Sequence, residues 1–94
     1  MSLDTARKKR LRALAHSLKP VVIVGQHGVT GPVLEEIEIA LAHHQLLKVK
    51  LRAERDARAQ WLEQILAQTG ADNVQTIGQV AVLYRRNPDR PEII

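Results

Sequence analysis

The stretch of sequence that decides the fold is residues 21–28, Val21-Val22-Ile23-Val24-Gly25-Gln26-His27-Gly28. Its four consecutive β-branched residues predict a buried strand, which ends at Gly25. Thr30 is a suitable N-cap for a helix that begins with Gly31-Pro32 and extends to about His44. The inward stripe of this helix is expected to be Val33, Leu34, Ile37, Ala40 and Leu41.

Helical and strand patterns alternate on either side of this segment. Asp4 can cap a first helix that ends at Lys19-Pro20, because the residue before a proline is displaced from the α region. The apolar stripe of that helix is Leu11, Leu14, Ala15 and Leu18. From Leu46 to Arg52 apolar and basic residues alternate, which predicts a second strand.

The last third of the chain completes the alternation. A helix is expected from about Asp56 to Thr69, with Gly70 at its C′ position. Strands at 74–77 and 80–84 follow, joined by a Gly-X pair suited to a type II′ hairpin turn. The helix is expected to bury Trp61, Leu62, Ile65 and Leu66.

The order α-β-α-β-α-β-β predicts an α/β fold, a two-layer sandwich on a four-stranded mixed sheet. With 94 residues, the chain has room for one domain. We expect this domain to span residues 1–86 and to be followed by a loose tail, residues 87–94, that contains Pro88 and Pro91.

The positive charge is concentrated in the first third of the chain. The net charge is +4, yet residues 5–34 contain six Lys or Arg residues and no Asp or Glu. Lys9, Arg12 and His16 are expected on the face of the first helix opposite its apolar stripe. Such a face is suited to a polyanion, and the alternative is an ordinary solvated helix surface.

The loop Gly25-Gln26-His27-Gly28 joins the buried strand to a helix N-terminus, where free N–H groups and the helix dipole favour an anion. Glycines permit positive φ and let a phosphodiester approach the main chain. The Gln26 and His27 side chains would project outward beside the phosphate, and cations of the first helix, with Lys19, are expected to reach the same anion. The alternative is an ordinary strand-to-helix turn.

A secondary basic surface is expected on the second strand, where Lys48, Lys50 and Arg52 share one face. The same residues would also suit the solvated side of a sheet, where lysine discourages edge pairing. Exposed aromatic side chains for stacking bases are not expected, because Trp61 and Tyr84 are the only aromatic residues.

Other kinds of chemistry receive little support from the sequence. The chain has no cysteine, and the neighbouring His43 and His44 diverge on a helix, so neither a metal nor any other cofactor is expected. No catalytic triad, GxGxxG motif or phosphate-binding P-loop is present, and we therefore expect no enzyme. No apolar stretch is long enough to cross a membrane, which favours the cytoplasm.

Several linked motifs, at residues 14–30, 35–37, 43–50, 70 and 73–85, closely resemble the YhbY-like CRM domain, the chloroplast RNA splicing and ribosome maturation module. The resemblance implies a fold like the C-terminal domain of the third bacterial translation initiation factor. It also implies RNA binding through the GxxG loop and the adjacent basic surface. Stand-alone bacterial members are linked to precursor large ribosomal subunits, so ribosomal RNA is the implied partner.

These observations predict a monomeric RNA-binding protein of the bacterial stand-alone type, with a place in ribosome assembly. One alternative is a KH module, which also uses GxxG but places it between two helices. The other is a protein-interaction module that docks on a ribosomal protein, with Ile39, which lies outside its helix's apolar stripe, as a contact.

Overall fold

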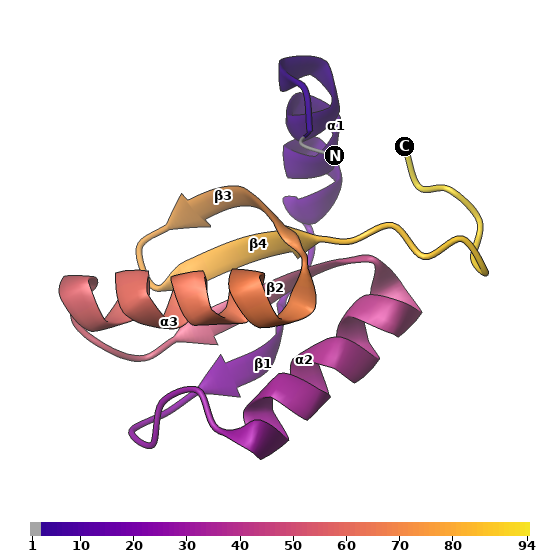
Figure 1. Cartoon of the computed structure of the whole chain (residues 1–94). Helices are drawn as coiled ribbons and strands as arrows, with labels where there is room; N and C mark the ends of the chain where they lie inside the picture. Colours follow the sequence, from indigo (N-terminus) through magenta and orange to yellow (C-terminus); the bar gives the residue numbers. More distant parts are fainter. Residues whose placement is uncertain (1–2) are drawn as a thin grey trace.

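The computed structural model of the chain describes residues 3–94. Helices and strands follow one another in the predicted order, α-β-α-β-α-β-β (Figure 1). The elements are α1 Thr5–Ala15, β1 Pro20–Val24, α2 Gly31–His44, β2 Leu46–Leu51, α3 Arg55–Thr69, β3 Asp72–Ile77 and β4 Val80–Tyr84.

The four strands form one mixed sheet in the order β1-β2-β4-β3. β1 and β2 are parallel and are connected through α2, whereas β4 is antiparallel to both β2 and β3. Gly78 has a φ of +56° in the β3–β4 turn, as the first central residue of a type II′ turn requires. The predicted α/β fold with a four-stranded mixed sheet is therefore confirmed.

Two apolar cores lie on opposite faces of the sheet. The larger core joins the sheet to α2 and α3, and its fully buried members include Val22, Ile37, Val49, Ile65 and Leu83. The smaller core joins the sheet to α1 and consists of Leu11, Ala15, Leu46, Val74, Val82 and Tyr84. The predicted two-layer sandwich thus describes the sheet with α2 and α3, while α1 covers one end of the second face.

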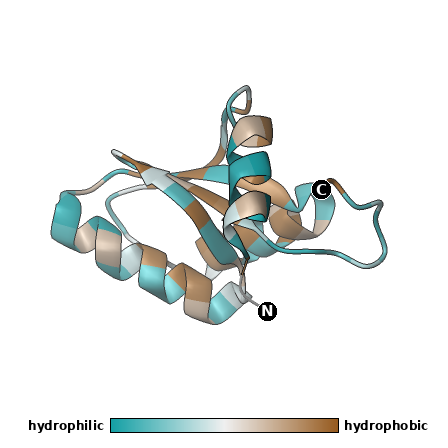
Figure 2. Cartoon of the chain, turned by 90° about the horizontal axis from the view of Figure 1, so that it is seen from above, coloured by the Kyte–Doolittle hydropathy of each residue, from teal (hydrophilic) through white to brown (hydrophobic). Residues whose placement is uncertain are grey.

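The part of this second face that α1 leaves uncovered is called the open face. The hydropathy pattern fits this arrangement, since hydrophilic and hydrophobic bands alternate along helices and strands (Figure 2). The predicted stripes of α2 and α3 pack against the larger core. In β2, Leu47, Val49 and Leu51 are buried while Lys48 and Lys50 lie on the open face, as predicted.

Two predictions of burial are wrong. α1 ends at Ala15, and Leu14 and Leu18 are 46% and 38% exposed. The short helix buries only Leu11 and Ala15, which lie one turn apart on the side that faces the sheet. In β1, Ile23 is 50% exposed and Val21 is similarly open to solvent. β1 is an edge strand covered by helices on one face, so half of its β-branched run stays outside the core.

The segment 87–94, expected to be loose, makes specific contacts in the structure. Gln45 ends α2 with a φ of 63° and is 3% exposed. Its Nε2 donates a hydrogen bond to the Pro91 carbonyl at 2.9 Å, and its Oε1 accepts one from the Asn87 N–H at 2.9 Å. Ile93 and Ile94 pack against the smaller core, so this segment returns to α1.

Candidate nucleic-acid interface

The GxxG loop is a tight turn at the carboxyl end of β1. The Gly28 N–H donates a hydrogen bond to the Gly25 carbonyl at 2.9 Å, and Gln26 and His27 form the exposed tip of the turn. Gly28 has a φ of +70°, and a Cβ there would lie 3.2 Å from Nε1 of Trp61. Position 28 therefore requires glycine for two reasons, whereas a Cβ at Gly25 would meet nothing within 4 Å.

The loop leads directly into the N-terminus of α2. The Thr30 hydroxyl accepts a hydrogen bond from the Val33 N–H at 3.3 Å, which confirms the predicted N-cap. The hydroxyl is the acceptor in this bond and keeps its own O–H donor, so Thr30 caps the helix and remains a candidate binding residue. Of the first residues of α2, only Gly31 keeps an N–H without an intrahelical partner, because Pro32 has no N–H and the Val33 N–H is bonded to Thr30. This leaves one helix donor beside the exposed loop tip.

The predicted residues of α1 gather at the other end of the sheet. Lys9, Arg12 and His16 are spaced by one and two turns and share a flank of the helix. Arg12 is half-buried at the border of the open face, whereas Lys9 and His16 are exposed. Lys48 Nζ donates a hydrogen bond to the Leu18 carbonyl at 3.0 Å and so ties this end to β2.

The expectation that the first helix and the GxxG loop meet at the same anion is wrong. α1 precedes β1 and the loop follows it, and the loop lies away from α1 in Figure 1. The five residues Pro20–Val24 span about 13 Å in an extended strand. A single phosphate therefore cannot contact both groups.

The secondary basic surface joins the two ends. Because β1 and β2 are parallel, Lys48 lies opposite Pro20 at the α1 end and Lys50 lies opposite Ile23. The Arg52 N–H donates to the Val24 carbonyl at 3.0 Å, directly before the loop. Side chains two residues apart on a strand are about 7 Å apart, so they form a row from one end to the other.

We call this row, together with the basic residues at its α1 end, the basic track. Its members are Lys9, Arg12, His16, Lys19, Lys48, Lys50 and Arg52. The acidic residues Glu35, Glu36 and Glu38 belong to α2, on the other side of the sheet. The Glu38 Oε2 accepts a hydrogen bond from Arg85 NH1 at 2.8 Å. Thus α2 adds no negative charge to the open face.

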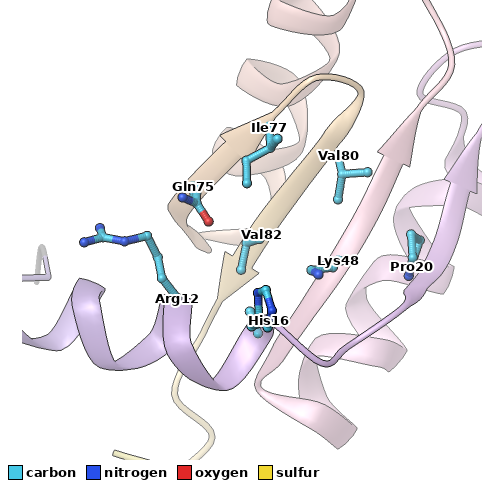
Figure 3. A pocket seen from close by; sticks show the side chains of 9 residues that line it. Arg12, His16, Pro20, Lys48, Gln75, Ile77, Val80 and Val82 are labelled. Carbon is cyan, nitrogen blue, oxygen red and sulfur yellow. The ribbon is translucent and has the colours of Figure 1, made fainter.

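A pocket of about 250 Å³ lies where α1 meets the open face (Figure 3). It is lined by Arg12, Ala15, His16, Pro20, Lys48, Gln75, Ile77, Val80 and Val82. The sequence pattern identified its cations but not Gln75 or the apolar floor. Alternation in β3 and β4 could have placed some of these side chains on one face, yet it could not show that α1 stands beside them.

The histidines of α2 are close to each other, with ring centroids 4.6 Å apart. His43 Nδ1 lies 3.0 Å from Arg90 NH2, in the C-terminal segment. Residues 3–94 contain no cluster of three His, Cys, Asp or Glu side chains that could hold a metal ion. Within the same residues, no helix has the length and apolar character needed to cross a membrane.

The fold and the basic track define a small α/β domain with a surface whose charge is suited to a polyanion. The chain belongs to the CRS1 / YhbY (CRM) domain family, whose model matches residues 3–85. The match spans every helix and strand of the described structure, so the resemblance seen in the sequence motifs is confirmed.

Curated relatives and a solved structure agree with this assignment. A probable RNA-binding protein of Pseudomonas aeruginosa is 48% identical over 89 residues, covering 94% of this chain and 86% of that protein. An RNA-binding protein of Haemophilus influenzae is 48% identical over 85 residues, covering 89% and 86%. The solution structure of a hypothetical protein from Staphylococcus aureus matches with a TM-score of 0.84 and 29% identity, covering 99% of this chain and 98% of that one.

Proposed function

We propose that this protein binds RNA by its sugar-phosphate backbone, through the GxxG loop and the basic track. Its partner is ribosomal RNA in the precursor of the large ribosomal subunit, and its role is in the assembly of that subunit. The protein acts in the cytoplasm as a monomer, by binding and not by catalysis, and requires no cofactor. The RNA-binding names of its bacterial relatives support the first of these statements.

The observation that carries the proposal is the continuity of the basic track with the loop. Lys48 and Lys50 lie on the open face between the basic residues at the α1 end and Arg52, which adjoins the carboxyl end of β1 where the loop begins. In this proposal cations neutralise successive phosphates, and the Gly31 N–H at the start of α2 donates to a phosphate oxygen at the end of the row.

Recognition of the backbone is favoured because neither aromatic residue offers a stacking platform. Tyr84 is 7% exposed in the smaller core, and Trp61 is half-buried against the larger core and Gly28. RRM and OB-type domains bind bases on exposed aromatic rings. Phosphate contacts fix the position of the RNA without reading its sequence, which suits a protein directed to one site by RNA shape.

The decisive experiment replaces Gln26 and His27 by Asp together. Both side chains are exposed, and negative charge is tolerated at a helix N-terminus, so the fold should be retained. Each carboxylate about 4 Å from a phosphate costs about 1 kcal/mol in a water-like environment, which predicts a roughly 30-fold loss of affinity for deproteinised ribosomal RNA.

The matched control is Gln64→Glu with Gln68→Glu. It adds two negative charges on the exposed side of α3, across the sheet from the open face. This variant should bind as the parent does, and circular dichroism with a thermal melt should show that both variants are folded. An Asp-Asp variant that is folded and binds RNA like the parent would remove the loop from the interface.

One observation favours a second candidate function, docking on a ribosomal protein. Ile39 is 65% exposed on α2, where it borders a shallow depression with Ala42 and Pro91. Deproteinised RNA separates the two functions, because a protein-docking module would bind it no better than an unrelated protein of equal net charge.

A further inference from the structure

The pocket beside α1 combines two chemistries that the rest of the basic track lacks. Its floor and walls are carbon, from Ala15, Pro20, Val80 and Val82, while Gln75 places an amide at its side (Figure 3). Five elements contribute to it, so its shape is set by the packing of α1 on the sheet.

The charged residues at the rim of the pocket, Arg12 and Lys48, are both cations. Arg12, His16 and Lys48 surround the apolar floor, and no Asp or Glu lines it. Arg12 has no salt-bridge partner among residues 3–94, and Lys48 Nζ uses one of its three donors on the Leu18 carbonyl. Donors therefore stay available at the rim for a phosphate that lies outside the pocket.

We propose that this pocket receives one unpaired nucleobase of the bound RNA, with the neighbouring phosphates on Arg12 and Lys48. The inference rests on the proposed RNA binding and extends it from the backbone to a base. An apolar floor excludes the phosphate itself, because an ion buried against carbon loses its hydration. A flat heterocycle loses little hydration free energy there and gains contact with the valine side chains.

Size and hydrogen bonding agree with this occupant. A volume of about 250 Å³ is below the roughly 300–1,000 Å³ of pockets for drug-sized ligands and leaves room for one ring system. The Gln75 amide both donates and accepts, as the edge of an unpaired base does. Its side chain makes no hydrogen bond to any residue in the described part of the chain. A base in a duplex is stacked and paired and cannot enter.

The test compares two single-stranded RNAs of equal length and charge, a uridine oligonucleotide of about twelve residues and its abasic counterpart. The parent should bind the uridine RNA about tenfold more tightly, the order expected for one bound base. Val80→Phe fills the pocket and should bring that ratio close to one without changing affinity for the abasic RNA. Gln75→Leu keeps the shape, removes the amide and should lower the ratio about threefold.

Ile39→Phe is the control, since it adds an aromatic ring on α2, across the sheet from the pocket, and should leave the ratio unchanged. Equal affinity of the parent for both RNAs would refute the base pocket and leave backbone binding intact. Absence of binding to either RNA would refute the proposed function itself. Folded variants at positions 80 and 75 that keep the full ratio would show that a base binds elsewhere, and the pocket would then suit a protein segment. If Val80→Phe does not fold, Gln75→Leu decides.

Discussion

Replacement of Lys50 by Gln tests whether the two ends of the interface belong to one RNA path. Lys50 is the central cation of the β2 row, opposite Ile23 in β1 and Val80 in β4, and is half-buried on the open face. Glutamine keeps the first two methylene groups of the aliphatic stem that covers these neighbours, so stability should change by no more than about 0.5 kcal/mol.

The magnitude follows from the number of phosphates that the basic track is proposed to neutralise. Each contact with a single strand contributes about −0.7 to the slope of log K against log salt, so six Lys and Arg side chains give a slope of about −4. Loss of one cation should reduce the slope by about 0.7. At about 0.15 M salt, this corresponds to a roughly fourfold loss of affinity, equal for all RNA sequences.

The assay is a fluorescence anisotropy titration of parent and variant at four or five salt concentrations. Arg10→Gln is the matched control, because it removes the same charge from the flank of α1 opposite Arg12. It should leave the slope unchanged. If Lys50→Gln has the parent's slope and affinity while Arg12→Gln weakens binding, the strand row does not contact RNA and the track is not continuous.

Two further predictions concern stability. Gly28→Ala should destabilise the protein by about 1–2 kcal/mol and lower its Tm by roughly 5–15 °C, because φ is positive and the Trp61 indole lies close. Gly25→Ala should be nearly neutral. Equal melting temperatures for the two variants in differential scanning calorimetry would contradict the requirement for glycine at position 28. Gln45→Ala should lower the free energy of unfolding in urea by about 1–3 kcal/mol, because the hydrogen bonds of the side-chain amide to Asn87 and Pro91 are lost. Limited proteolysis should then release the C-terminal segment. A segment that resists the protease would mean that its isoleucines alone hold it in place.

The order of elements was predictable because each strand and helix has its own local signal. The β-branched run, the Thr30 cap, the alternation in β2 and Gly70 after α3 each specify one boundary or one face. Local patterns do not show which elements lie next to each other in the folded structure. The exposed half of β1 depends on its place at the edge of the sheet, which is set by pairing of residues far apart in sequence.

The site was predictable as a set of residues but not as an arrangement. Charge clustering identified the cations of α1 and β2, since charge is visible in the sequence itself. Their separation from the loop follows from β1 lying between them, and the position of Lys50 between the two ends follows from the parallel register. Gln45 was missed because a glutamine with positive φ is unusual, and its partners in the C-terminal segment lie more than 40 residues away.

A uniform row of cations would let RNA bind in either direction and slide along the surface, because phosphates repeat identically. The two ends of the proposed interface differ in chemistry. One end is an exposed turn with main-chain donors for a phosphate, and the other is a pocket with an apolar floor and the Gln75 amide. A strand that satisfies both ends at once has a fixed direction and a fixed register. Placement on the RNA then requires no reading of an extended sequence, only a short single-stranded stretch with one base free to leave the stack.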